Sequence, residues 1–232
     1  MKIGIMQPYF FPYIGYWQLI NAVDKFVIYD DVNFIMRGYI NRNAILINGQ
    51  AYKFSIPLEK PSQNKLINET KLNFSDSAKN DFLKTIELAY KKAPCYKEVY
   101  PVLNKIIYNK ETDLTTFIKF AIKTVNQYLG INTEILLSSD IEKDNSLKGQ
   151  NKIIEICKLL NASQYINPIG GVDLYDKAKF QNENIKLNFL QTKYIIYEQF
   201  NNDFVENLSI IDVMMFNTRE QIQNMLVKYD LV

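Results

Sequence analysis

In the first third of the chain, short apolar runs alternate with a segment of helical spacing. An apolar run covers residues 2–6, and a loop broken by prolines covers residues 7–12. Over residues 14–23 the apolar side chains recur at roughly the 3.6-residue period of a helix, and residues 26–29 form a second continuous run. This order predicts a strand, a loop, a helix and a buried parallel strand that ends at Asp30.

The next segment has the alternation of a β-hairpin. Residues 44–47 and 51–57 flank the pair Asn48-Gly49. An Asn-Gly pair between two such runs is a strong hairpin signal, because both residues readily adopt the positive φ angles of a tight turn. The polar residues 60–73 that follow are expected to form an exposed loop.

Helical spacing dominates the middle of the chain. Three helices are predicted between Ser75 and Gly130, and Pro94 is expected to stop the first of them. Gly130 stands where the C-cap of a helix is usually found. We therefore expect a mainly helical insertion over about residues 75–130.

In the last third, predicted strands and helices alternate. Strands are expected at residues 133–137, 164–167 and 185–190, and helices at residues 151–160, 175–182 and 209–229. Strands that alternate with helices form a parallel sheet covered on both faces. The sequence predicts one α/β domain over residues 1–232, Rossmann-like or synthetase-like, with a mostly parallel sheet flanked by helices.

Charge and hydropathy narrow the classes of function. With 27 basic and 25 acidic residues, the net charge of +2 supplies no long-range field that would draw the chain onto nucleic acid or an anionic membrane. No apolar run reaches the roughly 20 residues that cross a bilayer, and the N-terminus lacks the pattern of a signal peptide. We expect a cytoplasmic protein without nucleic-acid binding or membrane insertion, and its oligomeric state is left open.

Histidine is absent from the chain. This excludes Ser-His and Cys-His nucleophile pairs, histidine general bases and histidine-containing zinc sites. Cys95 and Cys157 lie far apart among apolar neighbours, which favours reduced core thiols over a disulfide. The chemistry must use carboxylates, Lys, Arg, Tyr, Asn, Gln or backbone amides; no metal-binding residue is assigned, and the sequence identifies no cofactor.

Four loops at predicted strand ends carry candidate chemistry, since ligands of parallel sheets bind outside the carboxyl ends of the strands. The first contains Gln7, Tyr13, Gly15 and Tyr16 before a helix N-terminus, where free amides and the helix dipole favour an anion. The glycine would let a phosphate or sugar approach the backbone closely. The alternative is a hydrophobic loop tucked under the domain.

The second candidate loop follows the second predicted strand. Arg37 and Arg42 are two of only three arginines, and their planar groups suit bidentate contacts with phosphate or carboxylate. Asn41 is suited to orienting a sugar or acyl group. Asp30 and Asp31 could hold a metal-bound diphosphate, act as a base towards an amine, or pair with the two arginines in a purely structural salt bridge.

The third and fourth loops also have residues that suit phosphate or sugar contacts. Ser139 lies at a strand end and Lys148-Gly149 precedes a predicted helix, which resembles a phosphate cradle without the glycine spacing of a Walker motif. In the fourth loop, Asn167 is followed by Gly170 and Gly171. Such glycines permit either close approach of a ligand or tight packing of strand and helix.

Short motifs along the chain resemble those of the WbqC-like family. They occur in the family's order from residue 1 to about residue 225 and comprise Met6-Gln7-Pro8, residues 11–16, 30–34 and 41–43, Lys92-Ala93-Pro94, Leu129-Gly130-Ile131, Ile156-Cys157-Lys158, residues 165–171, Tyr175 and residues 208–212. The resemblance implies a role in the biosynthesis of O-antigen or other surface polysaccharides. It also implies a tryptophan and a histidine in the helix after the hairpin, where this chain has residues 77–82 without either.

The resemblance implies an enzyme that adds a glycyl or similar acyl group to the amine of a nucleotide-linked amino sugar. Its partners would be a nucleotide sugar and an activated acyl donor. Asp30 or Asp31 would be catalytic, and the other loop residues above would bind substrate. Two rivals are an ATP-dependent ligase or nucleotidyltransferase of synthetase-like fold, and a non-catalytic scaffold of a polysaccharide assembly pathway.

Overall fold

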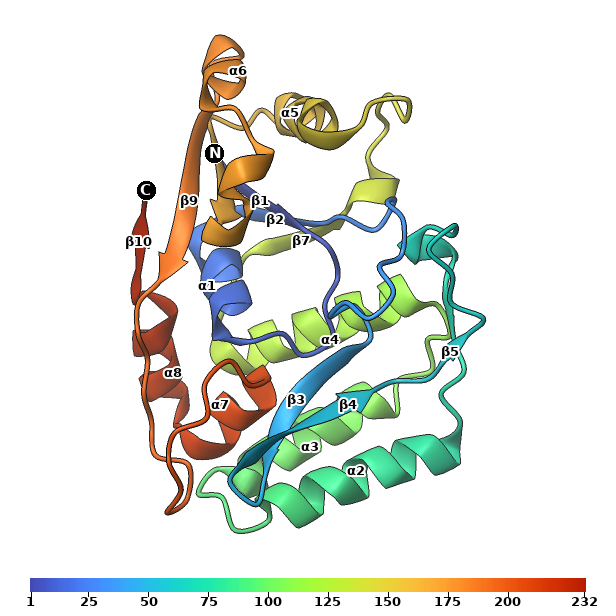
Figure 1. Cartoon of the computed structure of the whole chain (residues 1–232), viewed down its shortest axis with the longest axis vertical. Coiled ribbons are helices and arrows are strands. Elements are labelled where there is room, and N and C mark those ends of the chain that lie inside the picture. Colours follow the sequence, from blue (N-terminus) through green and yellow to red (C-terminus); the bar gives the residue numbers. More distant parts are fainter.

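A six-stranded sheet forms the upper part of the structure, and a hairpin packed with helices forms the lower part (Figure 1). The computed structural model describes all residues 1–232. In spatial order the strands are β10 (Tyr229–Leu231), β9 (Lys186–Thr192), β8 (Gln164–Pro168), β1 (Lys2–Met6), β2 (Lys25–Ile28) and β7 (Glu134–Leu137). All neighbours are parallel except β9 and β10. The predicted α/β class with a mostly parallel sheet is confirmed.

The sheet is covered on both faces by helices. Successive strand residues point to opposite faces, so Phe26 packs on the side of α1 (Ile14–Ala22), whereas Val27 packs on the side of α5 (Gly149–Leu159) and α6 (Lys177–Asn182). Burial on both faces explains why the parallel strands have continuous apolar runs in the sequence.

The strand order reverses between β1 and β8. From β1 the chain builds β2 and β7 on one side, and it then crosses to build β8 and β9 on the other side. In doubly wound sheets the crevice at the carboxyl ends of these two central strands is the usual place for a ligand. The fold therefore predicts a ligand site at the loops that follow Met6 and Pro168.

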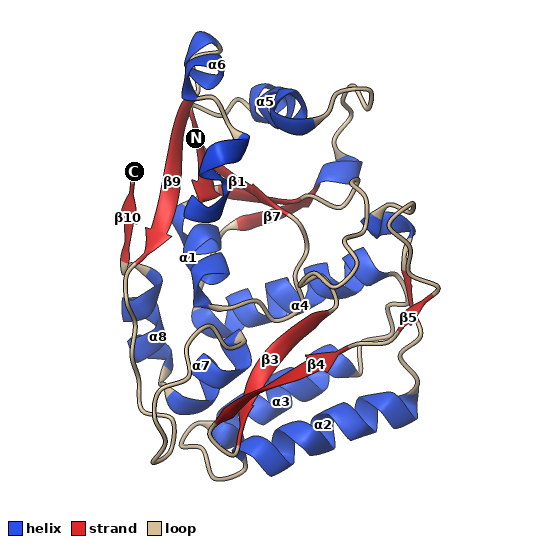
Figure 2. Ribbon diagram, in the orientation of Figure 1, coloured by secondary structure: helices blue, strands red, loops and turns tan.

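A hairpin and the three helices that follow it in the sequence lie in the lower part (Figure 2). These elements are β3 (Arg42–Ile47), β4 (Gln50–Ser55), α2 (Asp76–Tyr90), α3 (Tyr96–Ile107) and α4 (Leu114–Leu129). The predicted turn is present, with φ angles of 51° at Asn48 and 72° at Gly49. Ser75 caps α2 by accepting the Ala78 N–H at 3.3 Å, and Gly130 ends α4 at a φ of 74°. None of the helices is long and apolar enough to cross a membrane.

Two sequence-based predictions are wrong. Residues 60–73 are not simply an exposed loop, because they contain the 3-10 helix Ile67–Glu69 and the strand β6 (Lys71–Leu72), which pairs with β5 (Leu58–Glu59). The final helical pattern does not reach residue 229: α7 (Ile210–Phe216) and α8 (Arg219–Leu226) are followed by β10. Strands of two or three residues are too short to show the alternation of apolar and polar residues by which a strand is predicted from sequence.

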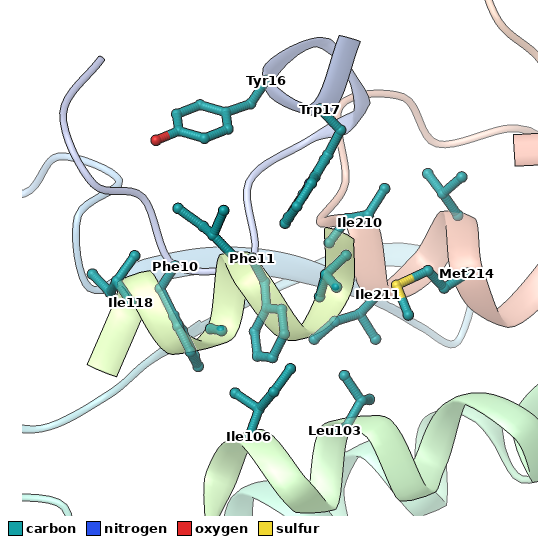
Figure 3. Close-up of a cluster of buried hydrophobic side chains, with 14 of the residues drawn as sticks. Phe10, Phe11, Tyr16, Trp17, Leu103, Ile106, Ile118, Ile210, Ile211 and Met214 are labelled. Carbon is teal, nitrogen blue, oxygen red and sulfur yellow. The ribbon is translucent and has the colours of Figure 1, made fainter. Parts of the chain in front are cut away.

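The loop after β1 anchors the sheet to the lower part of the molecule. Phe10 and Phe11 are fully buried, and Phe11 has a φ of 47°. The Phe11 carbonyl accepts hydrogen bonds from Asn43 Nδ2 at 2.7 Å and from Ser209 Oγ at 2.8 Å. Figure 3 shows the two rings among Leu103, Ile106, Ile118, Ile210, Ile211 and Met214. For this half of the first candidate loop, the alternative of a hydrophobic loop tucked under the domain is therefore correct.

A buried carboxylate fixes α7 to its surroundings. Asp212 is fully buried and accepts hydrogen bonds from Tyr90 Oη at 2.8 Å, Tyr197 Oη at 2.7 Å and Gln199 Nε2 at 2.6 Å. Burial raises the pKa of Asp212, although the three donors oppose that shift. Its partners come from α2 and from the segment after β9, so its role is to hold these elements together.

Candidate functional site

Two cavities open at the carboxyl edge of the sheet. The lysine pocket, of about 650 Å³, lies beyond β2 and β7 and is lined by Tyr29, Asp31, Val32, Asn33, Leu66, Asn68, Ser139, Lys143, Asn145, Leu147, Lys148, Gly149 and Lys152. The tyrosine pocket, of about 400 Å³, lies beyond β1 and β8 and is lined by Met6, Tyr9, Pro12, Tyr13, Tyr16, Tyr39, Asn43, Pro168 and Asn207. The candidate loops therefore contribute to more than one cavity.

Asp31 lies between two buried lysines in the lysine pocket. Its Oδ2 is 2.8 Å from Lys143 Nζ and 3.0 Å from Lys152 Nζ, and the side chains of the two lysines are only 2% and 8% exposed. Burial alone would raise the pKa of Asp31, but Lys143, Ser138 and Lys152 together lower it below its ordinary value. One carboxylate facing two ammonium groups leaves an excess of positive charge, which suits an anionic ligand.

The neighbouring Asp30 has a different environment. It is fully buried, and Ser139 donates its backbone N–H to Oδ1 at 3.0 Å and its hydroxyl to Oδ2 at 2.6 Å. Burial is the largest influence on the pKa of Asp30 and raises it above its ordinary value. Asp30 does not line the pocket, whereas Ser139 does. Asp30 can therefore reach a substrate only by proton transfer through the Ser139 hydroxyl.

The N-terminus of α5 opens into the same pocket. Lys148 is the N-cap residue but makes no side-chain cap, and Gly149 follows at a φ of 54°. The first N–H groups of a helix without a side-chain cap are free to bind an anion, and the helix dipole favours the negative charge. The structure thus brings Ser139 and Lys148-Gly149, the third candidate of the sequence, into one cavity with Asp31.

The tyrosine pocket contains no lysine, arginine or carboxylate. The ring of Tyr9 lies 5.6 Å from that of Tyr16 and 6.0 Å from that of Tyr39, measured between centroids. Tyr16 is buried, and its hydroxyl donates to the Gln7 carbonyl at 2.9 Å. Burial raises the pKa of Tyr9, Tyr13 and Tyr16, so these hydroxyls stay protonated at neutral pH. Of the predicted ligand contacts, Tyr13 and Tyr16 lie in this pocket.

The arginines of the second loop lie outside both pockets. Arg37 is exposed at a φ of 65°, and Arg42 begins β3 with a buried Nε that has no partner. Asn41 donates to the Ile56 carbonyl at 3.0 Å, which ties the loop to the hairpin. The alternative of an arginine–aspartate salt bridge is wrong, because the cations beside Asp31 are lysines.

Close packing of neighbouring side chains explains why a glycine is needed at position 15. A Cβ at this position would collide with the Tyr13 ring and would lie 2.7 Å from Thr192 Oγ1. The backbone carbonyl of Gln7 accepts a hydrogen bond from Tyr16 Oη, and the Gln7 side chain lines neither pocket. Contact of Gly15 or Gln7 with a ligand stays a prediction.

The fourth loop is held together mainly by its own contacts. A Cβ on Gly171 would collide with the amide of Asn167, whereas Gly170 has open space around it. Asn167 accepts from Tyr165 Oη at 3.0 Å and donates to the Pro168 carbonyl at 3.1 Å. Of this loop, only Pro168 lines the tyrosine pocket.

The sequence did not single out Lys143, Lys152, Tyr9 or Tyr39. Lysine and tyrosine are common in this chain, so none of these positions stands out by residue type. Only tertiary contacts bring Lys143 and Lys152 to Asp31, more than 100 positions earlier in the sequence. No group of three or more His, Cys, Asp or Glu side chains is placed to hold a metal ion.

Comparison with known proteins places the chain in a family. Residues 7–224 match the WbqC-like protein family. The chain is also similar to the uncharacterized protein Rv1507c of Mycobacterium tuberculosis (strain ATCC 25618 / H37Rv), with 27% identity over 219 residues, which cover 93% of each chain. No solved structure matches. Because the family match spans nearly the whole sequence, as the motifs predicted, this protein belongs to the WbqC-like protein family.

Proposed function

We propose that the protein is a transferase of surface-polysaccharide biosynthesis that adds a glycyl or similar acyl group to the amine of a nucleotide-linked amino sugar. The observation that carries this proposal is the lysine pocket, where two buried lysines share one carboxylate beside the N-terminus of α5. The pathway and the acyl group come from the resemblance to the WbqC-like family, and the pocket supports the binding of an anionic substrate.

The charges around the lysine pocket fit a diphosphate. The ammonium groups of Lys143 and Lys152 carry two positive charges, and the Asp31 carboxylate balances one of them. Lys148 adds an exposed ammonium group at the rim of the pocket. The free N–H groups of the first turn of α5, beginning with that of Gly149, would donate hydrogen bonds to phosphate oxygens. Tyr29, Val32, Leu66 and Leu147 supply apolar surface in the same cavity, which suits the base or sugar attached to the phosphates.

The Asp30–Ser139 pair suits the proton transfers of this reaction. The acceptor amine attacks the acyl carbon, a C–N bond forms, and the bond from that carbon to the leaving group breaks. The amine proton would pass to Ser139 Oγ while the Ser139 proton moves to Asp30, 2.6 Å away. The leaving group then takes a proton back by the same route, which restores the pair. The nearby lysines would stabilise the negative charge that develops on the acyl oxygen.

Replacing Lys148 by glutamine is expected to weaken the binding of uridine diphosphate by about tenfold, the effect of one charge-assisted contact. Folding should be unchanged, because Lys148 is exposed and forms no ion pair. The measurement is isothermal titration calorimetry with uridine diphosphate. Lys84→Gln on the exposed face of α2 is the matched control and should bind like the wild type.

Equal affinities of the Lys148 and Lys84 variants would contradict the assignment of the lysine pocket. Binding of ATP with magnesium but not of uridine diphosphate would favour the ligase or nucleotidyltransferase alternative. Absence of binding by any nucleotide would favour a scaffold. Transfer itself is tested by incubating the protein with a nucleotide-linked amino sugar and activated acyl donors, and by mass spectrometry of the sugar.

A further inference from the structure

A second, apolar cavity adjoins the tyrosine pocket at Tyr13. This apolar pocket has a volume of about 430 Å³, and its aliphatic lining consists of Ile14, Ile169, Leu190, Ile195, Leu208 and Val213. Tyr13 and Asn207 line both cavities. A ligand that passes the Tyr13 ring can therefore contact both at once.

The tyrosine pocket has the chemistry of a site for an uncharged sugar ring. Its aromatic faces can pack on the C–H face of a pyranose, and its polar groups are all neutral. The hydroxyls of Tyr9, Tyr13 and Tyr39 and the amide of Asn207 make no hydrogen bond within the protein, so they are free to bind sugar hydroxyls. The pocket also lies at the carboxyl ends of β1 and β8, where the strand order reverses.

The apolar pocket suits a short aliphatic chain. Its two charged residues do not offer a buried charge to a ligand, because Lys193 pairs with Asp230 at 2.8 Å and Glu206 is exposed. Tyr197 lines the pocket but donates its hydroxyl to Asp212. The six aliphatic side chains supply apolar area whose burial can stabilise a bound chain, beside the polar groups of Gln191, Thr192 and Tyr194.

We infer that the two cavities together bind one ligand, with an uncharged sugar ring in the tyrosine pocket and an acyl or alkyl substituent in the apolar pocket. This site goes beyond the proposed function, which concerns the lysine pocket, and names a ligand class for the crevice where the strand order reverses. It shares no lining residue with the lysine pocket. The two sites can therefore be tested separately.

The test compares methyl and hexyl glycosides of glucose and N-acetylglucosamine by calorimetry, below the concentrations at which they form micelles. Each buried methylene is worth about a fourfold gain in affinity, so we expect the hexyl compounds to bind wild type at least tenfold more tightly than the methyl compounds. Ile169→Asp should remove most of this gain. Tyr39→Ala should weaken both compounds by a similar factor. Leu88→Asp is the control, since Leu88 is exposed on α2.

Ile169 and Tyr39 are 38% and 63% exposed, so these substitutions leave the core intact. The inference is overturned if no glycoside binds, if chain length has no effect, or if Ile169→Asp behaves like Leu88→Asp. Uridine diphosphate is titrated in parallel. If uridine diphosphate binds but the glycosides do not, only this inference is overturned. If the glycosides bind but uridine diphosphate does not, the assignment of the lysine pocket is overturned.

Discussion

Replacing Asp31 by alanine is expected to destabilise the protein by about 3–5 kcal/mol, the usual cost of breaking a buried ion pair. The substitution leaves Lys143 and Lys152 in a site where their side chains are only 2% and 8% exposed, without the carboxylate that balances them. The loss is measured by urea denaturation at pH 7. Pyrophosphate should stabilise this variant more than it stabilises wild type, because the anion can replace the missing carboxylate.

Asp140→Ala is the matched control for this prediction. Asp140 also faces a lysine, Lys119, but at 3.7 Å and with 67% of its side chain exposed. An exposed pair of this kind contributes little, so the change in unfolding free energy should stay within about 0.5 kcal/mol. If the Asp31 and Asp140 variants lose the same stability, the buried lysines do not depend on Asp31.

Replacing Phe10 by alanine is expected to cost about 3–5 kcal/mol of unfolding free energy, because it removes a fully buried ring and leaves a cavity. The centroid of the Phe10 ring lies 4.3 Å from that of Phe11, 5.7 Å from that of Phe117 and 6.1 Å from that of Phe54. These neighbours belong to the β1–α1 loop, α4 and β4. Phe10 therefore joins the sheet to the lower part of the molecule.

The measurement is equilibrium denaturation of Phe10→Ala beside Leu88→Ala. Leu88 is 66% exposed on α2, so its truncation should change stability by less than about 0.5 kcal/mol. A loss below about 1 kcal/mol for Phe10→Ala would contradict the role of this ring as a core anchor.

The parts of the fold with strong local signals were predictable from the sequence. The run at residues 2–6 is β1, the Asn48-Gly49 pair turns the hairpin, and Ser75 caps α2. These signals depend on neighbouring residues alone. By contrast, β10 exists because residues 229–231 pair with β9, and such a contact leaves no periodic pattern in three residues.

The candidate site was predictable only in part, for the same reason. The rule that ligands bind at the carboxyl ends of parallel strands led to Asp31, Ser139 and Tyr13, and all three line cavities there. Arg37 and Arg42 were predicted to bind an anion because arginine is rare in the chain. The positive charges in the lysine pocket come instead from lysines. Long-range contacts select those lysines, and residue type alone does not distinguish them from others.

A crystal structure of the protein soaked with uridine diphosphate tests most directly whether the lysine pocket is an anion site. We expect the diphosphate in that pocket, with phosphate oxygens within hydrogen-bonding distance of Lys148 Nζ and the backbone N–H of Gly149. Lys143 and Lys152 should stay beside Asp31 and face the anion. A diphosphate bound elsewhere, for example at the N-terminus of α1, would contradict the assignment, and so would an empty lysine pocket in crystals of a protein that binds the nucleotide in solution.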